Sequence, residues 1–413
     1  MGARARRPLQ SKLIEHHGYI PETHNIWTED HYCLTVHRII GPKTYNITSS
    51  IEQPAKTVID CIEKSILLNF DTSTFTRKPE NNSLFRPPVL LVHGIFCSSV
   101  DWLLLGPQKA LAYTLCQAGY DVWLANVRGN EYSKKHQIYT TKDKEFWDFS
   151  FHEIGYYDLP AIIDYVLEQT AYSELSYIGY SQGTTSFYVM GSERPEYNAK
   201  VKVMVSLAPV AFLYNQQSNF ITFLMKYLHL STLAEWSSFY FKINQVFPYS
   251  EFRACAINVI IRNVPSELTK RACKICFHLI AGFGSNQLEN DMFPRIFGHF
   301  PAGCSFKQIF HYGQSILKGS FSKFDYGLRK NLKKYGCAQL NEYNLKNVTV
   351  PVAIFYAEND SLTNDVQKLI DDLPNVIETK KIEYSKFNHV DFIWGKDSKK
   401  LVFENVLAVL NRY

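Results

Sequence analysis

The stretch from Ile178 to Gly183, with the sequence Ile-Gly-Tyr-Ser-Gln-Gly, constrains the fold of this chain more than any other. It has the pattern Gly-x-Ser-x-Gly, in which a serine stands at a sharp turn between a strand and a helix. An apolar run from Leu175 suits the strand, and residues 184–190 can continue as the helix. The pattern predicts that Ser181 presents its hydroxyl at a sheet edge, since glycine on both sides leaves room for a strained backbone. The alternative is a glycine-rich turn that only opens a helix.

Strands and helices are expected to alternate along most of the chain. Two β-rich runs, residues 25–28 and 32–39, predict an opening hairpin, and the patterns over residues 102–117 and 158–169 predict two helices. Residues 146–155 read as an aromatic loop. Further strands are expected at Val89–Val92, Val122–Ala125, Leu175–Ile178, Val203–Leu207, Val352–Tyr356 and Lys381–Tyr384. Because most of these runs are continuously apolar, they indicate a parallel sheet that is covered on both faces.

The alternation breaks between residues 212 and 340, where Phe, Leu and Ile recur at helical spacing. We predict an inserted helical cap there, with the core divided between residues 15–211 and residues 341–413. The composition suits one large core, because the 413 residues are 46% hydrophobic and only 20% charged. A net charge of +5 without a basic block argues against a nucleic-acid binder.

The nine cysteines are scattered, and only Cys273 and Cys276 stand at short spacing. Without a second pair of Cys or His, a zinc site is not expected, and the pair suits helix packing or a disulfide better than redox chemistry. No run is long and apolar enough to span a bilayer, and the basic N-terminus does not read as a secretory signal. Sequons at Asn46, Asn81 and Asn347 are about as many as chance provides.

A serine hydroxyl needs a base to take its proton, and the base needs a partner that fixes its tautomer. In this type of sheet the partners follow along the chain in the order Ser, Asp or Glu, His. Asp360 comes just after one expected strand, and His389 comes after the next. Both are therefore expected at the carboxyl edge of the sheet, beside Ser181. Asp365 and Asp391 are the rival acids, and the plain alternative for His389 is a histidine of a surface loop.

Two backbone N–H groups are expected to hold the oxyanion that forms during acyl transfer. The first belongs to Gln182, directly after the serine, and the second to Ile95, in the loop after the first buried strand. Gly94 lets that loop approach the substrate. We expect the neighbouring His93 to fix the loop through a hydrogen bond rather than to act as a base. This chemistry needs no metal and no organic cofactor.

With these residues in place, the chain resembles the acid lipase family of α/β-hydrolases, which includes gastric and lysosomal acid lipases. The resemblance covers about residues 15–410, and its strongest single signature is the run Phe146–Ala161. Further matching stretches are Thr28–Tyr32, Leu91–Gly94, Asn126–Asn130, Ser181–Thr185, Leu207–Val210, Glu358–Asp360 and Asn388–Phe392. By this match the family's nucleophile, acid and base fall on Ser181, Asp360 and His389. Its oxyanion donors fall on Ile95 and Gln182.

The resemblance implies an α/β-hydrolase fold, with a mostly parallel eight-stranded sheet flanked by helices and an inserted helical cap. It also implies hydrolysis of neutral lipid esters, triacylglycerols or cholesteryl esters, in lipid catabolism under a mobile cap. Members usually carry histidine before the nucleophile, where this chain has Tyr180; we expect that residue to pack in the elbow and to influence substrate preference. Animal members are commonly secreted or lysosomal, so we expect a missing leader rather than a cytosolic product.

Two other functions stay open at this point. Because a fold does not fix a function, a non-catalytic lipid-binding or carrier protein is the second hypothesis. A small-ester carboxylesterase is the third, and it differs from a lipase only in the acyl chain that it prefers. The aromatic content of 15% suits either a well-filled core or an acyl-binding surface.

Overall fold

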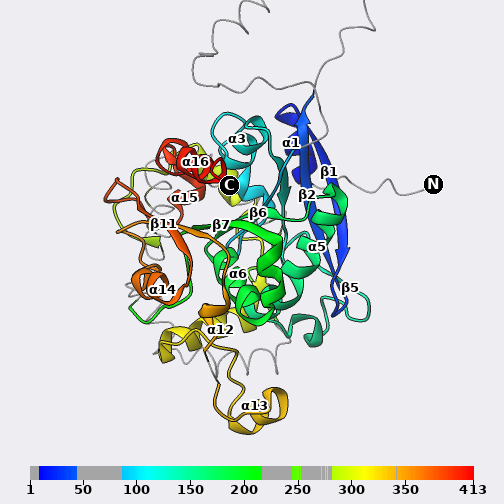
Figure 1. Ribbon diagram of the computed structural model, residues 1–413. Coiled ribbons are helices and arrows are strands. Elements are labelled where there is room, and N and C mark those ends of the chain that lie inside the picture. The colour runs from blue at the N-terminus through cyan, green and yellow to red at the C-terminus, as the bar shows by residue number, and fades with distance from the viewer. Residues whose placement is uncertain are drawn as a thin grey trace, which may run out of the picture.

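A mixed β-sheet runs through the middle of the computed structural model, which describes residues 9–43, 86–215, 244–250, 252, 271, 275, 277, 281–340 and 342–413 (Figure 1). Eight strands form its main path in the order β1-β2-β4-β3-β6-β7-β10-β11, and the short β5 pairs with β2. The strands are β1 (Tyr19–Trp27), β2 (Tyr32–Pro42), β3 (Pro88–Val92), β4 (Asp121–Leu124), β5 (Lys135–His136), β6 (Leu175–Tyr180), β7 (Val201–Leu207), β10 (Val352–Tyr356) and β11 (Val376–Lys381). All pairs from β4 to β11 are parallel, whereas β2 pairs antiparallel with both β1 and β4. The predicted fold class is confirmed.

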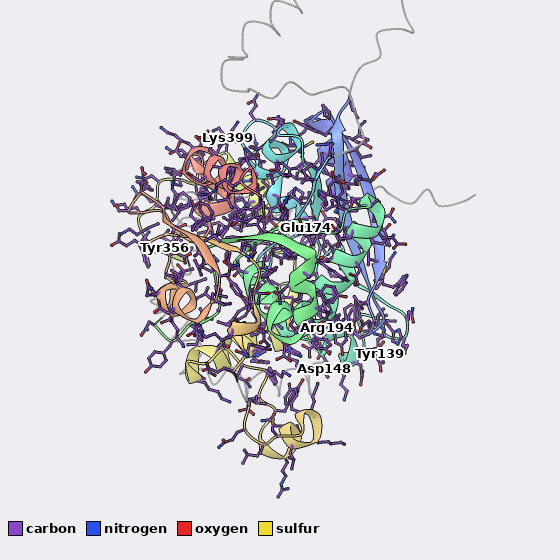
Figure 2. All side chains as sticks on the ribbon, in the orientation of Figure 1. Tyr139, Asp148, Glu174, Arg194, Tyr356 and Lys399 are labelled. Carbon is purple, nitrogen blue, oxygen red and sulfur yellow. The ribbon has the colours of Figure 1, made fainter. Side chains whose placement is uncertain are left out.

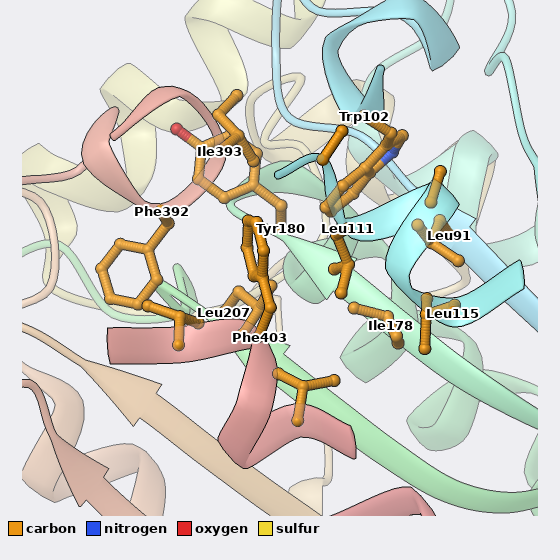
Figure 3. Packing of buried hydrophobic residues seen from close by; sticks show 14 of the residues in the cluster. Leu91, Trp102, Leu111, Leu115, Ile178, Tyr180, Leu207, Phe392, Ile393 and Phe403 are labelled. Atoms are coloured by element: carbon orange, nitrogen blue, oxygen red, sulfur yellow. The ribbon is translucent and has the colours of Figure 1, made fainter. Parts of the chain in front are cut away.

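Side chains of the parallel strands alternate between two apolar clusters, one on each face of the sheet. In β6, Ile178 and Tyr180 belong to the first cluster, whereas Leu175 and Tyr177 belong to the second. Figure 3 shows part of the first cluster, where Tyr180 lies among side chains from neighbouring strands and helices. Because both faces are buried, these strands appear in the sequence as continuous apolar runs.

Helices cover both faces of the sheet, and side chains fill the space between the layers (Figures 1 and 2). The first cluster draws on α3 (Leu111–Gln117), α11 (Met292–Phe297), α15 (Asp391–Trp394) and α16 (Glu404–Leu410). The second draws on α4 (Phe151–Glu153), α5 (Leu159–Thr170), α6 (Gln182–Glu193) and α14 (Val366–Asp372). The remaining helices and helical turns are α1 (Leu9–His16), η2 (Ser99–Trp102), η3 (Lys144–Trp147), η4 (Ile154–Asp158), η5 (Pro195–Lys200), α12 (Phe306–Lys318), α13 (Leu328–Tyr335), η6 (Leu345–Asn347) and η7 (Lys399–Phe403).

Three local predictions were wrong. Residues 102–117 do not form one helix: Gly106, with φ of +81°, and Pro107 break the pattern between η2 and α3. The strand expected at 381–384 lies earlier, at 376–381, where it pairs with β10. The aromatic run 146–155 is not a loop throughout: η3 includes its first two residues, and Ser150 and Glu153 form a capping box that starts α4 at residue 151.

The region predicted to form the cap is described in part. Its strand β9 (Cys304–Ser305) pairs with β8 (Gln245–Val246), and α12 follows directly. That helix is attached to the core, since the Lys307 ammonium lies 2.8 Å from the Asp148 carboxylate and the Tyr312 hydroxyl donates to Thr185 at 3.1 Å. The cap boundaries stay a prediction, and the pair Cys273 and Cys276 lies outside the described residues.

Candidate active site

Ser181 stands between β6 and α6 on a backbone with φ of +52° and ψ of −116°. Residues other than glycine rarely adopt such angles, at a cost of about 1–3 kcal/mol, so the surroundings must hold the turn in place. The N–H of Ser181 donates to the carbonyl of Leu207 at 3.0 Å, and its carbonyl accepts from the N–H and hydroxyl of Thr184 at 2.8 and 2.6 Å. These bonds keep the serine at the carboxyl end of β6.

The two glycines of the motif are required by close packing beneath the serine. A Cβ atom at Gly179 would lie 2.8 Å from the carbonyl carbon of Gly183. A Cβ atom at Gly183 would lie 2.2 Å from the carbonyl oxygen of Val92, at the end of β3. Backbone atoms cannot swing away as a side chain can, so any larger residue would push α6 off the sheet.

The structure brings the three predicted side chains into one hydrogen-bonded chain. His389 Nε2 lies 2.8 Å from Ser181 Oγ, and His389 Nδ1 lies 2.8 Å from Asp360 Oδ2. All three side chains are buried. Because a carboxylate only accepts, Nδ1 carries the proton, which leaves Nε2 free to accept from the serine hydroxyl. This geometry is the one that activates a serine for attack on a carbonyl.

The rival acids serve other partners. Asp391 Oδ2 accepts from the Ser285 hydroxyl at 2.6 Å and from the N–H of Asn388 at 2.8 Å. Asp365 accepts from the side-chain amide and the N–H of Asn215. Asp391 thus fixes the turn that carries the histidine, and of the three carboxylates only Asp360 bonds to the imidazole among the described residues.

The two predicted oxyanion donors follow β3 and β6, which are neighbours in the sheet. Within the described part of the chain, neither the N–H of Ile95 nor that of Gln182 donates to another group. A Cβ at Gly94 would lie 2.9 Å from the Tyr180 ring and 3.1 Å from Ser181 Cβ, so glycine is needed for this loop to come close to the serine. Both amides therefore stay available for a substrate oxygen.

His93 fixes the loop after β3 through hydrogen bonds, as predicted. Its Nδ1 donates to the carbonyl of Gly94 at 2.8 Å, and its Nε2 accepts from the N–H of Val127 at 3.3 Å and from Asn130 Nδ2 at 3.0 Å. Burial lowers the pKa of His93 to about 4, so the ring is neutral at ordinary pH. The loop after β4 in this way braces the loop after β3.

Comparison with known proteins decides the family. Residues 10–106 match the partial α/β-hydrolase lipase region, and residues 87–240 match the α/β-hydrolase fold. The chain is 37% identical to Lipase 1 of Drosophila melanogaster, over 97% of this chain and 79% of the relative. It is 31% identical to human gastric triacylglycerol lipase, over 97% of this chain and 90% of the relative. The chain belongs to the lipase family of α/β hydrolases.

This lipase-family chain is a carboxylic ester hydrolase by class, and the relatives support lipid esters as its substrates. A crystal structure of a Sulfolobus solfataricus protein shares the fold, with a TM-score of 0.56 at 11% identity over 96% of this chain and 95% of that one. Among the described residues, no group of three or more His, Cys, Asp or Glu is placed to hold a metal ion. The helices within the described ranges are all too short or too polar to cross a membrane.

Tyr180 has a contact that the sequence did not reveal. Its ring is buried beside Trp102, with the ring centroids 6.3 Å apart, and its hydroxyl donates to the carbonyl of His389 at 3.1 Å. The expectation that Tyr180 packs in the elbow is confirmed. The hydroxyl also ties the residue before the serine to the loop that carries the imidazole.

A strap of residues 281–285 joins the loops that carry Asp360 and His389. The carbonyl of Ala281 accepts from the N–H of His389 at 3.2 Å, and the carbonyl of Gly282 accepts from Asn388 Nδ2 at 3.0 Å. Asn359 Nδ2 donates to the carbonyl of Phe283 at 2.9 Å. The glycines of the Gly-Phe-Gly sequence at 282–284 indicate a close approach, but the sequence does not say to which loops.

Proposed function

We propose that this protein is a serine lipase that hydrolyses triacylglycerols or sterol esters through an acyl-enzyme. The chain from Ser181 through His389 to Asp360, with 2.8 Å at each step, is the observation that carries the proposal. Similarity to gastric triacylglycerol lipase favours triacylglycerol, and it also favours a secreted or lysosomal site of action over a cytosolic one.

In the proposed mechanism, the Ser181 oxygen attacks the ester carbonyl while its proton passes to His389 Nε2. The carbonyl oxygen becomes an oxyanion, which the N–H groups of Ile95 and Gln182 bind. The tetrahedral intermediate collapses, the C–O bond to the alcohol breaks, and His389 gives its proton to the leaving oxygen. Asp360 accepts from Nδ1 throughout and stabilises the imidazolium.

Water completes the cycle. It enters where the alcohol left, gives a proton to His389 Nε2 and attacks the acyl carbonyl of the ester on Ser181. The second tetrahedral intermediate breaks its bond to the serine oxygen, which regains the proton. The products are one alcohol and one fatty acid, and the enzyme returns to its starting state without a metal or an organic cofactor.

Ser181→Ala tests the proposal directly. Turnover should fall by about 10⁴-fold or more, because the remaining groups only bind the substrate and the oxyanion. Ser186→Ala is the matched control, since it removes a nearby buried hydroxyl, on α6, that has no partner among the described residues. We expect Ser186→Ala to keep wild-type turnover. Ester hydrolysis that survives Ser181→Ala would exclude the mechanism.

The same assay separates the two other candidate functions. A lipid carrier would bind long-chain esters without turnover in the wild type. A small-ester carboxylesterase would show its highest kcat/KM on dissolved short-chain esters and no rise in activity when the substrate passes into an emulsion. We expect the opposite, namely a preference for long acyl chains and higher activity on emulsified substrate.

A further inference from the structure

Helix α13 has no role in the mechanism proposed above. It projects from the body beyond α12 (Figure 1). Its inner side is fixed, because Asn331 Nδ2 donates to the Asp325 carboxylate at 2.7 Å and the Tyr335 hydroxyl donates to the carbonyl of Phe324 at 3.1 Å. The helix is therefore held in place along one side, while its other sides face outward.

The outward sides combine apolar and cationic side chains. Leu328 and Leu332 are 67% and 58% exposed, and they lie one turn apart on the same side. Arg329 and Lys333, the residues that directly follow the two leucines, form an exposed row next to them. Neither cation forms an ion pair within the described part of the chain. A leucine stripe bordered by cations is the composition of a helix that lies in a lipid–water interface.

The position of α13 relates it to the candidate active site. Lys318, at the end of α12, forms an ion pair with Asp325, and Gln314 Nε2 donates to the carbonyl of Asp325 at 2.9 Å. Helix α12 in turn reaches α6 through the bond from Tyr312 to Thr185. A surface that binds α13 thus lies on the side of the molecule that carries α12, the helix that bonds to α6 four residues after Ser181.

We propose that α13 docks on a lipid–water interface that carries anionic amphiphiles. Leu328 and Leu332 enter the apolar layer, and Arg329 and Lys333 lie among the anionic headgroups. This inference rests on the proposed function and deepens it, because an enzyme that acts on insoluble esters must reach their surface. Each ester that it cleaves leaves a fatty acid whose carboxylate adds negative charge to that surface.

Vesicle binding by the full chain tests the proposal. Ser181→Ala is present in every protein, so that the lipid is not hydrolysed. Sedimentation compares vesicles of phosphatidylcholine with vesicles that contain about one third phosphatidylglycerol. Arg329→Gln with Lys333→Gln should weaken binding to the anionic vesicles by about 10- to 30-fold, since each cation near the surface contributes about fivefold. Leu328→Ser with Leu332→Ser should weaken it by about tenfold or more.

The matched control is Lys12→Gln with Lys399→Gln, which removes the same charge. Helix α1, which carries Lys12, and the labelled Lys399 lie at the end of the molecule opposite α13 (Figures 1 and 2). We expect this pair to bind as the parent does. Equal losses for the control and the α13 pairs, or equal binding to both kinds of vesicle, would overturn the proposal. Loss with the cations but not with the leucines would overturn it too, since that pattern indicates attraction to headgroup charge without insertion into the apolar layer.

Different results would exclude the proposed function and the docking of α13. A wild type that turns over neither dissolved nor emulsified esters would exclude the hydrolase, while α13-dependent vesicle binding would keep this inference. Conversely, the wild type could hydrolyse dissolved esters while none of the four α13 substitutions changes vesicle binding. That result would exclude this inference alone.

Discussion

At the scale of single residues, Tyr180 sets this chain apart from the pattern of the family that it resembles. The position before the nucleophile carries a buried ring whose hydroxyl reaches across to the carbonyl of His389. That carbonyl belongs to the same residue whose imidazole lies 2.8 Å from Ser181. A single side chain therefore couples the turn that carries Ser181, the proposed nucleophile, to the backbone of His389, the proposed base.

Tyr180→Phe should loosen that backbone without unfolding the protein. A buried hydrogen bond contributes about 1 kcal/mol, so we expect kcat to fall by about three- to tenfold with a smaller change in KM. The matched control is Tyr188→Phe, which removes another buried hydroxyl, bonded to Ser206 at 2.8 Å in the second cluster. Steady-state kinetics and thermal unfolding of both variants check this. Equal kcat values in the two variants would show that the Tyr180 bond only contributes to stability.

The approximate positions of Ser181, Asp360 and His389, the proposed catalytic side chains, follow from the sequence because a simple rule governs them. Parallel strands end at one edge of a sheet, so a serine, an acid and a histidine that each follow a strand lie at that same edge, where their loops can bring them together. No comparable rule predicts the bond of Tyr180, which joins residues 209 positions apart. That contact depends on the path of the loop that carries His389, and the residue types around Tyr180 do not predict this path.

At the scale of elements, the strap 281–285 is bonded to both the loop of Asp360 and the loop of His389. Gly282 has φ of +122°, and a Cβ atom there would lie 1.9 Å from the carbonyl oxygen of Asn359. The clash is with backbone next to Asp360, so it can be relieved only by moving that loop or the strap itself. Since the strap also accepts from His389 N–H, either movement changes the distance between acid and base.

Gly282→Ala should therefore lower kcat by about tenfold or more and destabilise the fold by about 2–4 kcal/mol. Gly284→Ala is the control, because Gly284 also has a positive φ, of +83°, but an added Cβ would meet only Lys386 Cδ, at 3.7 Å. It carries the backbone strain without the clash. Activity assays and urea unfolding of both variants separate the two causes. A Gly284→Ala enzyme as slow as Gly282→Ala would mean that strain, not the clash, disturbs the loops.

Elements were predictable where one local signal dominated. The buried strands β3, β4, β6, β7 and β10 were found from their apolar runs. The 102–117 helix failed because its amphipathic pattern continues across Gly106 and Pro107, where the backbone cannot stay helical. Strand β11 was predicted at the wrong residues because it lies at the sheet edge and mixes polar with apolar residues. Its sequence pattern is therefore no clearer than that of the adjacent residues 381–384, where the strand was expected.

At the scale of the whole molecule, burial creates two sets of titrating groups with opposite effects on stability. Burial lowers the pKa of four histidines from 6.5 to about 3 or 4, namely His37, His93, His299 and His311. Burial raises the pKa of three carboxyls from 3.8 to about 6 or 7, namely Asp101, Asp158 and Asp391. As the pH falls below 6.5, protons bind these histidines only in the unfolded chain, which lowers stability. Below about pH 7, protons bind these carboxyls in the folded chain first, which raises stability.

Removing one of these carboxyls should change how the free energy of unfolding depends on pH. Asp101 is buried, and its Oδ2 accepts from the N–H of Ser98 at 2.7 Å, a bond that an asparagine oxygen can replace. Because its folded pKa of about 7 lies above the unfolded value, Asp101 stabilises the wild type at acidic pH and loses this effect as the pH rises through 7. Asp101→Asn lacks the effect altogether. Its free energy of unfolding relative to wild type should therefore fall by about 2 kcal/mol between pH 8 and pH 5.

Urea unfolding of both proteins at pH 5, 6, 7 and 8 measures that difference. A constant cost from imperfect packing of the asparagine would shift the whole difference curve without tilting it, so only the slope reports on the carboxyl. A curve that stays level would mean that Asp101 is ionised in the folded protein, which requires a cation or water to reach it. A curve that tilts the other way would mean that the folded protein stabilises the ionised form, and burial would then no longer be the dominant influence on this carboxyl.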